Sequence, residues 1–229
     1  FQLTDMHVGN TIGKAFVQEC VDRINALNPD IVVITGDLLD RKIEHAKEEL
    51  SPLKELQTRF GTYFILGNHE YYHGAEEIAA YMPQLNIKAL LNENVVIRDG
   101  EKAINLVGIN DLQSIRFKTL EVDTYKAFEK VDRTLPTILL SHQPKSVKIV
   151  EEHHYDLMIS GHTHGGQIFP FGFLVMLDQP YLAGLHAVSA AKQIFVSRGT
   201  GYWGPPVRVF APSEISILTL KPRFILAES

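Results

Sequence analysis

The chain has 229 residues, which is long enough to bury a hydrophobic core without disulfides or structural metals. Its 45% hydrophobic and 21% charged residues are typical of a globular protein and exclude a disordered or fibrous chain. The net charge of −5 provides no general basic surface for nucleic acid or an anionic membrane. Ten histidines stand beside one cysteine, Cys20, so an intrachain disulfide is excluded and any metal ligands would be imidazole and oxygen donors.

Helix and strand patterns alternate along the first two thirds of the chain, and strand patterns dominate the rest. The apolar residues of the first helix recur every 3.6 positions until Asn28-Pro29 ends it. The β-branched run Ile31–Thr35 is typical of a strand buried on both faces. In chain order we predict a strand at 1–4, a helix at 13–27, a strand at 31–35, a helix at 44–58, a strand at 62–66, a helix at 76–82, strands at 95–98 and 103–108, a helix at 120–131, a strand at 137–140, a helix at 146–153, and strands at 157–160, 193–197, 207–210 and 215–220.

The chain shows no internal repeat, low-complexity tract or linker, so we predict one domain over residues 1–229. The alternation of elements predicts an α/β (α+β) fold with two mixed β-sheets and helices outside them. Phe1 is not an initiator and only Phe1–Thr4 precede the first polar motif, so we expect an upstream segment to be missing, through processing or by design. A signal or membrane anchor there stays open, although no apolar run in the chain approaches the roughly 18 to 20 residues that span a bilayer.

Polar motifs follow five of the predicted strands at their carboxyl ends. They are Asp5-Met6-His7, Gly36-Asp37, Gly67-Asn68-His69-Glu70, Ser141-His142 and Gly161-His162-Thr163-His164. Because the carboxyl ends of strands form the ligand-binding edge of layered α/β folds, these side chains can converge although they are far apart in sequence. Residues two apart on an extended chain face the same side, which pairs Asp5 with His7 and His162 with His164. The glycines in these motifs let the backbone pass close to a metal cluster.

The motifs supply seven candidate donors for metal ions. These are Asp5, His7, Asp37, Asn68, His142, His162 and His164. Seven donors exceed the ligands of one four-coordinate ion, and the carboxylate of Asp37 is able to bridge two ions. We therefore predict a binuclear site, whose mixed imidazole and oxygen donors suit Mn, Fe or Zn better than Mg or Ca.

The ordered set of motifs resembles the calcineurin-like metallophosphoesterase superfamily over essentially the whole chain. The stretches Leu140-Ser-His-Gln-Pro144 and Gly161–Ile168 are similar to its bacterial YkuE/YaeI-type branch. The resemblance implies a four-layer α/β/β/α fold, in which two mixed β-sheets pack face to face in a sandwich flanked by helices. It also implies two divalent metal ions, for which we predict Mn²⁺, with Zn²⁺ or Fe as alternatives.

By the same resemblance, each metal ion has its own set of ligands. The first set is Asp5, His7, Asp37 and His164, and the second set is Asp37, Asn68, His142 and His162. His69 would be the general acid or a donor to phosphate, and Asn68 would also contact the substrate.

The segment Gly36-Asp37-Leu38-Leu39-Asp40-Arg41 is similar to the GDxxDR motif of protein Ser/Thr phosphatases. In that motif the second Asp orients the histidine and the Arg touches phosphate. We therefore predict Asp40 as the catalytic partner of His69 and Arg41 as a substrate contact. Lys42 departs from the pattern, because those phosphatases have Gly at this position.

The predicted function is hydrolysis of a phosphodiester or pyrophosphate bond by in-line attack of a metal-bridging hydroxide. The resemblance to the YkuE/YaeI branch implies a lipid- or cell-envelope-linked substrate and a location at a membrane or in the envelope, with the cytoplasm as the alternative. Alternative activities are a phosphomonoesterase and a nucleotide or cyclic nucleotide phosphodiesterase. A non-catalytic metal-binding scaffold of the same fold is the alternative from another class. No nucleic acid partner is expected, because the acidic chain shows no stripe of basic and aromatic residues.

The apolar stretch Ile168–Leu177 directly follows the last histidine motif. It is the longest apolar run of the chain, and it contains Pro170 and Gly172. We expect it to form a strand in the core. The alternative is an apolar wall beside the metal site that receives the hydrophobic part of a substrate.

Overall fold

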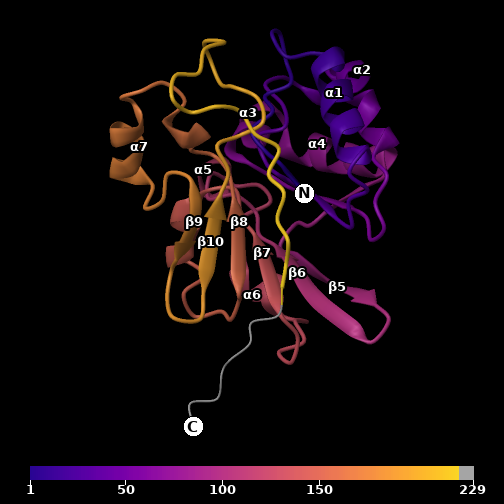
Figure 1. Cartoon of the computed structure of the whole chain (residues 1–229), viewed down its shortest axis with the longest axis vertical. Coiled ribbons are helices and arrows are strands. Elements are labelled where there is room, and N and C mark those ends of the chain that lie inside the picture. Colours follow the sequence, from indigo (N-terminus) through magenta and orange to yellow (C-terminus); the bar gives the residue numbers. More distant parts are fainter. Residues whose placement is uncertain (222–229) are drawn as a thin grey trace.

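Two β-sheets pack face to face between outer layers of helices in the computed structural model, which describes residues 1–221 (Figure 1). Apolar side chains of both sheets form the central layer of the core, among them Val33 and Ile65 from one sheet and Leu106 and Ile138 from the other. Residues 222–229, at the end of the predicted domain, lie outside the described residues. The predicted α/β fold with two sheets flanked by helices is confirmed.

The first sheet has the strand order β1-β2-β3-β4, and its neighbouring strands run parallel. The strands are β1 (Gln2–Leu3), β2 (Val32–Thr35), β3 (Thr62–Ile65) and β4 (Ile87–Ala89). Every residue of β2 is buried, as its continuous β-branched run predicts, because helices cover one face of the sheet and the second sheet covers the other. Its four described strands pair only in parallel, so this sheet is not mixed, although both sheets were expected to be.

The second sheet has the order β5-β6-β7-β8-β10-β9 and is mixed. Its strands are β5 (Glu93–Asp99), β6 (Lys102–Gly108), β7 (Thr137–Leu140), β8 (Leu157–Ser160), β9 (Gly184–Ala187) and β10 (Gln193–Val196). The outer strands β5 and β9 are antiparallel to their neighbours, whereas β6, β7, β8 and β10 run parallel. The parallel strands of both sheets end at one common edge, where Asp37 after β2 contacts His142 after β7, and Asp5 after β1 contacts His162 after β8.

Helices lie on the outer face of each sheet. The described helices of the chain are α1 (Lys14–Asn25), α2 (Lys47–Leu50), α3 (Asn68–His73), α4 (Ala75–Tyr81), α5 (Ser114–Phe117), α6 (Thr124–Phe128) and α7 (Gly172–Asp178), of which α7 covers neither sheet. α1 buries Val17, Cys20 and Val21 in the core of the first sheet, which matches its predicted apolar face. On the second sheet, Ala127 of α6 packs into the outer core.

Several predicted helices are shorter or more broken than expected. The helix predicted at 44–58 is divided into a 3-10 helix at Ile43–His45, α2, and a 3-10 helix at Ser51–Glu55. The helix predicted at 146–153 is instead a 3-10 helix at Pro144–Lys148. The helix predicted at 120–131 is reduced to α6. Pro52 lacks the N–H that would continue α2. The side chain of Asp123 accepts the N–H of Lys126 and so fixes the first turn of α6 at Thr124.

The end of the described chain is less regular than predicted. The strand predicted at 193–197 is confirmed as β10, but those at 207–210 and 215–220 are wrong. In their place, Val209 and Phe210 form isolated bridges to Ile168, and Ser216 forms one to Gln2. Prolines at positions 205, 206 and 212 remove backbone donors from this segment, which limits sheet pairing. The short strands β4 and β9 were not predicted, because neither carries a clear alternating pattern.

The apolar stretch Ile168–Leu177 is not a strand in the core, contrary to expectation. A loop with Pro170 opens it, and the remainder lies in α7, which has no buried residue. Proline interrupts strand pairing, and the chain turns outward here. α7 lies at the edge of the molecule, on the side away from α1 and α2 (Figure 1).

Candidate metal centre

Side chains that follow five strands meet at the common edge of the two sheets. They are Asp5 and His7 after β1, Asp37 after β2, Asn68 after β3, His142 after β7, and His162 and His164 after β8. Most are almost fully buried, which is unusual for so many polar groups unless they are paired or bind an ion. The structure therefore brings all seven predicted donors together, although they span 160 positions of the sequence.

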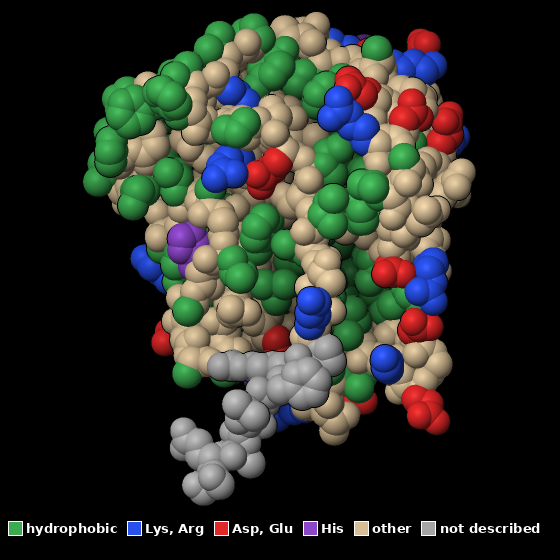
Figure 2. Space-filling view, in the orientation of Figure 1, with side chains coloured by type: hydrophobic (Ala, Val, Ile, Leu, Met, Phe, Trp, Pro, Cys, Tyr) green, Lys and Arg blue, Asp and Glu red, His purple; other side chains and the backbone are tan. Residues whose placement is uncertain are grey.

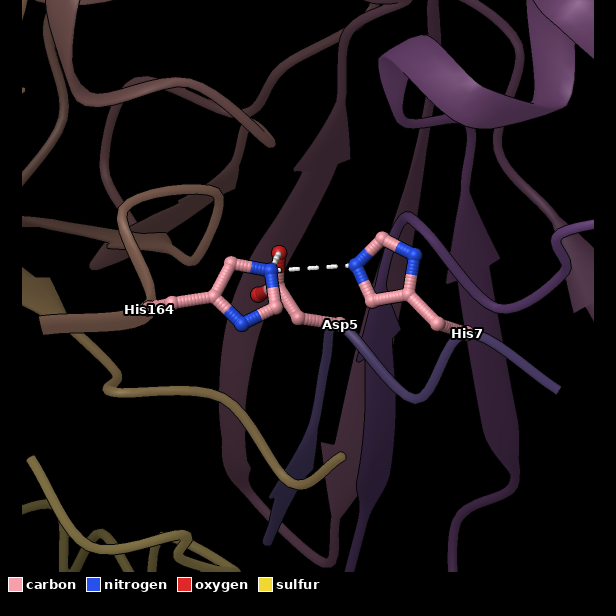
Figure 3. A group of neighbouring side chains, drawn as sticks. All are labelled: Asp5, His7 and His164. Atoms are coloured by element: carbon pink, nitrogen blue, oxygen red, sulfur yellow. Dashed lines mark hydrogen bonds and ion pairs between the residues drawn. The ribbon is translucent and has the colours of Figure 1, made fainter. Parts of the chain in front are cut away.

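The first cluster joins Asp5, His7 and His164 (Figure 3). Nε2 of His7 lies 3.0 Å from Nε2 of His164, and that same atom of His164 lies 3.4 Å from Oδ1 of Asp5. The hydroxyl of Thr4 and the backbone N–H of His162 both donate to the Asp5 carboxylate, which fixes its orientation. Three ligand atoms, from the segment after β1 and the segment after β8, thus point at one another.

The second cluster joins Asp37, His142 and His162, with Asn68 beside them. Nε2 of His142 lies 3.2 Å from Oδ2 of Asp37, 3.2 Å from Nδ1 of His162 and 3.1 Å from Oδ1 of Asn68. Nδ1 of His142 donates to the backbone carbonyl of Thr35 at 2.8 Å. A carbonyl only accepts, so this bond places the proton on Nδ1 and directs the other ring nitrogen into the cluster.

Asp37 lies between the two clusters. Its Oδ2 is 3.2 Å from Nε2 of His142 in the second cluster and 3.9 Å from Nε2 of His7 in the first. Its Oδ1 accepts the backbone N–H of His69 at 2.9 Å. One carboxylate therefore faces both clusters and is held in place by the first turn of α3.

His69 and Asp40 form a neighbouring pair at the same edge. Oδ1 of Asp40 lies 2.7 Å from Nδ1 of His69 and equally 2.7 Å from Nδ1 of His7. Burial disfavours a charge on His69, but Asp40 and Asp37 outweigh this effect and raise the pKa of the ring. The structure thus brings Asp40 to His69 as predicted, and it also ties Asp40 to His7, which the sequence did not indicate.

Arg41 is directed away from both clusters. Its guanidinium donates to the backbone carbonyl of His45 at 2.9 Å, pairs with Glu49 at 3.4 Å and contacts the side chain of Asn10. Arg41 is also not among the described residues that line the cavity at the clusters. Its contact with substrate stays a prediction that these partners do not favour.

The backbone at five of the candidate donors is left-handed, a conformation that non-glycine residues seldom adopt. These residues are Asp5, His7, Asp37, His162 and His164, with φ between 51° and 72°. Each such residue costs about 1–3 kcal/mol, and such strain is retained mainly at functional sites. Close packing adds a further constraint, because a Cβ on Gly67 would lie 2.3 Å from Oδ1 of Asp37 and one on Gly161 would lie 2.3 Å from Oδ2 of Asp5. The site is therefore tightly specified by its backbone.

The protonation states of the clusters fit a divalent metal ion. Burial lowers the pKa of both His162 and His164 to about 3, so these rings are neutral and offer lone pairs at neutral pH. Burial disfavours a charge on His142 as well, but Asp37 beside it outweighs this effect and raises its pKa. The buried carboxylate thus favours a positive neighbour, which a divalent cation supplies, and mixed nitrogen and oxygen donors suit Mn, Fe or Zn.

Glu70, the last residue of the Gly67–Glu70 motif, has a role that the sequence did not reveal. Its buried carboxylate accepts the backbone N–H groups of Asp37 and Gly67 on one oxygen, and those of Leu38 and Leu39 on the other. Burial and the nearby Asp37 raise the pKa of Glu70 to about 7. Glu70 therefore joins the loop after β2 to the start of α3 and holds Asp37 in position from behind.

We expect Glu70→Gln to lower the free energy of unfolding by about 2–4 kcal/mol, because its NH₂ group would face two backbone donors that a carboxylate oxygen accepts. Urea unfolding followed by circular dichroism measures the change. Glu77→Gln is the matched control, since Glu77 lies exposed on α4. Equal unfolding midpoints for the Glu70 variant and the wild type would show that these hydrogen bonds contribute little.

A cavity of about 1120 Å³ opens onto both clusters. Its polar side is formed by His7, Asp37, Asn68, His69, His162 and His164, and its apolar side by residues 168–171 and 173–175 with Trp203 and Pro205. Tyr72 and Trp203 flank His69, with ring centroids 5.2 and 6.3 Å from its imidazole. The stretch after the last histidine motif therefore does form an apolar wall beside the clusters, which was the alternative to a core strand.

Comparisons with known proteins identify the family to which the chain belongs. The model for the calcineurin-like phosphoesterase family matches residues 1–166. An uncharacterised metallophosphoesterase of Helicobacter pylori is 47% identical over 96% of this chain and 59% of its own length. A transmembrane protein with metallophosphoesterase domain from Danio rerio is 38% identical over 96% of this chain and 52% of its own length. The UDP-2,3-diacylglucosamine pyrophosphatase LpxG of Chlamydia muridarum is 28% identical over 95% of this chain and 82% of its own length.

The chain thus spans about three fifths of the length of the Helicobacter pylori relatives that it matches. Among solved structures, a 5′-nucleotidase precursor of Thermus thermophilus has a TM-score of 0.54 at 15% identity, over 86% of this chain and 48% of that chain. At this identity the likeness shows the fold alone. The predicted superfamily is confirmed, whereas the YkuE/YaeI branch stays a prediction. The chain belongs to the calcineurin-like phosphoesterase family, and the Helicobacter pylori relatives that it matches are named metallophosphoesterases.

Proposed function

We propose that this chain is a catalytic domain that hydrolyses a phosphodiester or pyrophosphate bond with two divalent metal ions. The observation that carries the proposal is the position of Asp37, whose Oδ2 faces a His/Asp cluster on each side at the polar end of one cavity. A carboxylate in this position is suited to bridge two ions. The proposal concerns residues 1–229 as one domain and not the longer proteins to which the chain is similar.

The two clusters define the proposed ligand sets. Asp5, His7, Asp37 and His164 would hold the first ion, and Asp37, Asn68, His142 and His162 would hold the second. When bound, the ions would supply Lewis-acid stabilisation of phosphoryl charge and an acidified water for attack. We propose Mn²⁺, with Zn²⁺ or Fe as alternatives, because the donors are imidazole nitrogens together with carboxylate and amide oxygens.

His69 is the proposed proton donor and phosphate contact. It lines the cavity, and Asp40 lies at its Nδ1, so the opposite nitrogen is left to face Asp37 and the cavity. Asp40 and Asp37 together raise the pKa of the ring against the effect of burial, which favours a protonated imidazole able to donate to a departing oxygen. Asp40 acts through His69 as a positioning residue. The side chain of Asn68, next to the second cluster, is the other proposed substrate contact.

We further propose that the substrate carries a lipid or cell-envelope group. The apolar wall of the cavity supports this, and so does the name of the Chlamydia muridarum relative, a UDP-2,3-diacylglucosamine pyrophosphatase. The Danio rerio relative is named as a transmembrane protein, whereas no helix among residues 1–221 of this chain is long and apolar enough to cross a bilayer. From the name of this relative and the apolar wall of the cavity, we propose association with a membrane or the envelope, with the cytoplasm as the alternative location.

An activity assay tests the proposal directly. Protein freed of metal by a chelator and then given Mn²⁺ is expected to hydrolyse bis(p-nitrophenyl) phosphate, and to be inactive without added metal. Comparison with p-nitrophenyl phosphate separates a diesterase from a monoesterase, and comparison of a UDP-linked acyl sugar with a soluble cyclic nucleotide tests the lipid preference. Absence of turnover with every ester under Mn²⁺, Zn²⁺ and Fe²⁺ would favour a non-catalytic scaffold.

A further inference from the structure

An exposed apolar projection stands beside the cavity. It consists of residues 168–178, which comprise the loop before α7 and α7 itself, and it is called the apolar arm below. α7 has no buried residue, and Leu177 is 84% exposed. Phe210, which is 88% exposed, lies against the base of the arm, with its ring centroid 5.9 Å from that of Phe169. Soluble proteins rarely leave so many large apolar side chains together in water without a partner.

The apolar arm is held in a defined position at both of its ends. At its start, the backbone of Ile168 bridges to Val209 and Phe210, and a Cβ on Gly166 would lie only 2.5 Å from Cα of Gly172. Just past its end, the buried side chain of Gln179 accepts the backbone N–H of Lys145 at 3.0 Å. The apolar side chains therefore project outward from a fixed base.

The charge pattern of the apolar arm favours a lipid surface as its partner. Asp178 is the single ionisable residue in 168–178, and its Oδ2 lies 2.8 Å from Nζ of Lys145. Lys145, which lies outside the arm, thus neutralises its one charge, whereas other parts of the surface mix Lys and Arg with Asp and Glu (Figure 2). Phenylalanine and leucine, which dominate the arm, are among the side chains that enter the headgroup and acyl boundary of a bilayer.

The apolar arm is also continuous with the cavity, because Phe169, Phe171 and Phe173 line the cavity opposite the two clusters. We propose that the apolar arm, with Phe210, inserts into the surface of a lipid bilayer and holds the mouth of the cavity against it. A phosphate ester with a hydrocarbon anchor then reaches the clusters along an apolar path without leaving the membrane for water. This lipid-binding role rests on the proposed lipid-linked substrate, but binding of the chain to vesicles is measured separately from hydrolysis.

Vesicle co-sedimentation tests the inference. The full chain is mixed with large unilamellar vesicles of phosphatidylcholine, with and without phosphatidylglycerol, and is expected to pellet with both. Leu177→Asp combined with Phe210→Asp is expected to weaken vesicle binding by at least about tenfold, since each change places a charge at the lipid boundary. Neither residue lines the cavity, so turnover of soluble bis(p-nitrophenyl) phosphate should stay unchanged in this variant.

Leu27→Asp combined with Tyr125→Asp is the matched control. Both residues are more than half exposed. Leu27 follows the last turn of α1 and Tyr125 lies in α6, and both helices are away from α7 (Figure 1). This control should bind vesicles like the wild type. The inference is overturned if the wild type stays in the supernatant, if both double variants bind equally well, or if the Leu177 and Phe210 changes only convert a dimer to a monomer. Loss of all hydrolysis with intact vesicle binding would reject the proposed function and leave the lipid surface standing.

Discussion

Replacing Asp37 with asparagine is expected to reduce Mn²⁺-dependent hydrolysis by more than about a hundredfold, since even residues that only support a metal ligand contribute up to that factor. Oδ2 of Asp37 lies 3.2 Å from Nε2 of His142 and 3.9 Å from Nε2 of His7, so one change removes a charge that faces both clusters. The amide keeps the size of the side chain. Steady-state kinetics with bis(p-nitrophenyl) phosphate, together with the manganese content of the desalted protein, measure the effect.

Asp30→Asn is the control for Asp37. The two aspartates flank the same strand, Asp30 before β2 and Asp37 after it, but Asp30 is exposed and pairs with Arg59. The Asp30 variant should keep the activity and the metal content of the wild type. Full turnover in a correctly folded Asp37→Asn protein would contradict the proposed role of this carboxylate.

Substitution of His69 by glutamine is expected to lower kcat by about 10²- to 10⁴-fold, the usual contribution of a general acid. The manganese content should remain, because His69 is outside the proposed ligand sets. Glutamine preserves a donor near Asp40 but cannot deliver a proton to a departing oxygen. The loss of kcat should be smaller for an ester whose leaving group has a low pKa, such as p-nitrophenolate, than for an alkyl ester. This difference identifies proton donation to the leaving group.

His73→Gln provides the comparison for His69. His73 ends the same short helix, and its ring centroid lies 6.3 Å from that of His69, but it does not line the cavity among the described residues. Its kcat should match that of the wild type. Equal kcat losses for the alkyl and p-nitrophenyl esters in His69→Gln would assign this residue to phosphate binding instead of proton transfer.

The strand ends could be predicted from the sequence because two independent patterns coincide there. The β-branched run of β2 predicts a strand buried on both faces, and Asp37 directly follows it. The same reasoning placed His142 after β7 and His162 after β8. Since parallel strands end at one edge, local patterns were sufficient to predict that these distant residues meet.

The local geometry of the site could not be predicted in the same way. Asp5 and His7 were expected to face one site because they are two apart on an extended chain. They do lie in one cluster, but the backbone at both residues is left-handed rather than extended, so the alternation of an extended chain is not the reason. Contacts such as Asp40 with His7 depend on long-range packing and leave no local pattern. Glu70 is a further case, because its four backbone donors come from two separate loops.

The apolar arm shows where hydrophobicity alone misleads. Ile168–Leu177 reads as a core strand, because burial is the usual fate of an apolar run. Pro170 and the attachment of Ile168 to Val209 turn it outward instead. Hydrophobicity in the sequence does not distinguish an apolar segment that packs in the core from one that binds a partner at the surface. The wrong prediction of a core strand therefore marks an exposed apolar surface.

Anomalous diffraction from crystals grown with Mn²⁺ tests the central claim most directly, because it locates each ion against its ligands. The account predicts two manganese peaks, one within bonding distance of Asp5, His7 and His164, the other within bonding distance of Asn68, His142 and His162, with Asp37 between them. A single peak, or peaks away from these side chains at saturating Mn²⁺, would contradict a two-metal site.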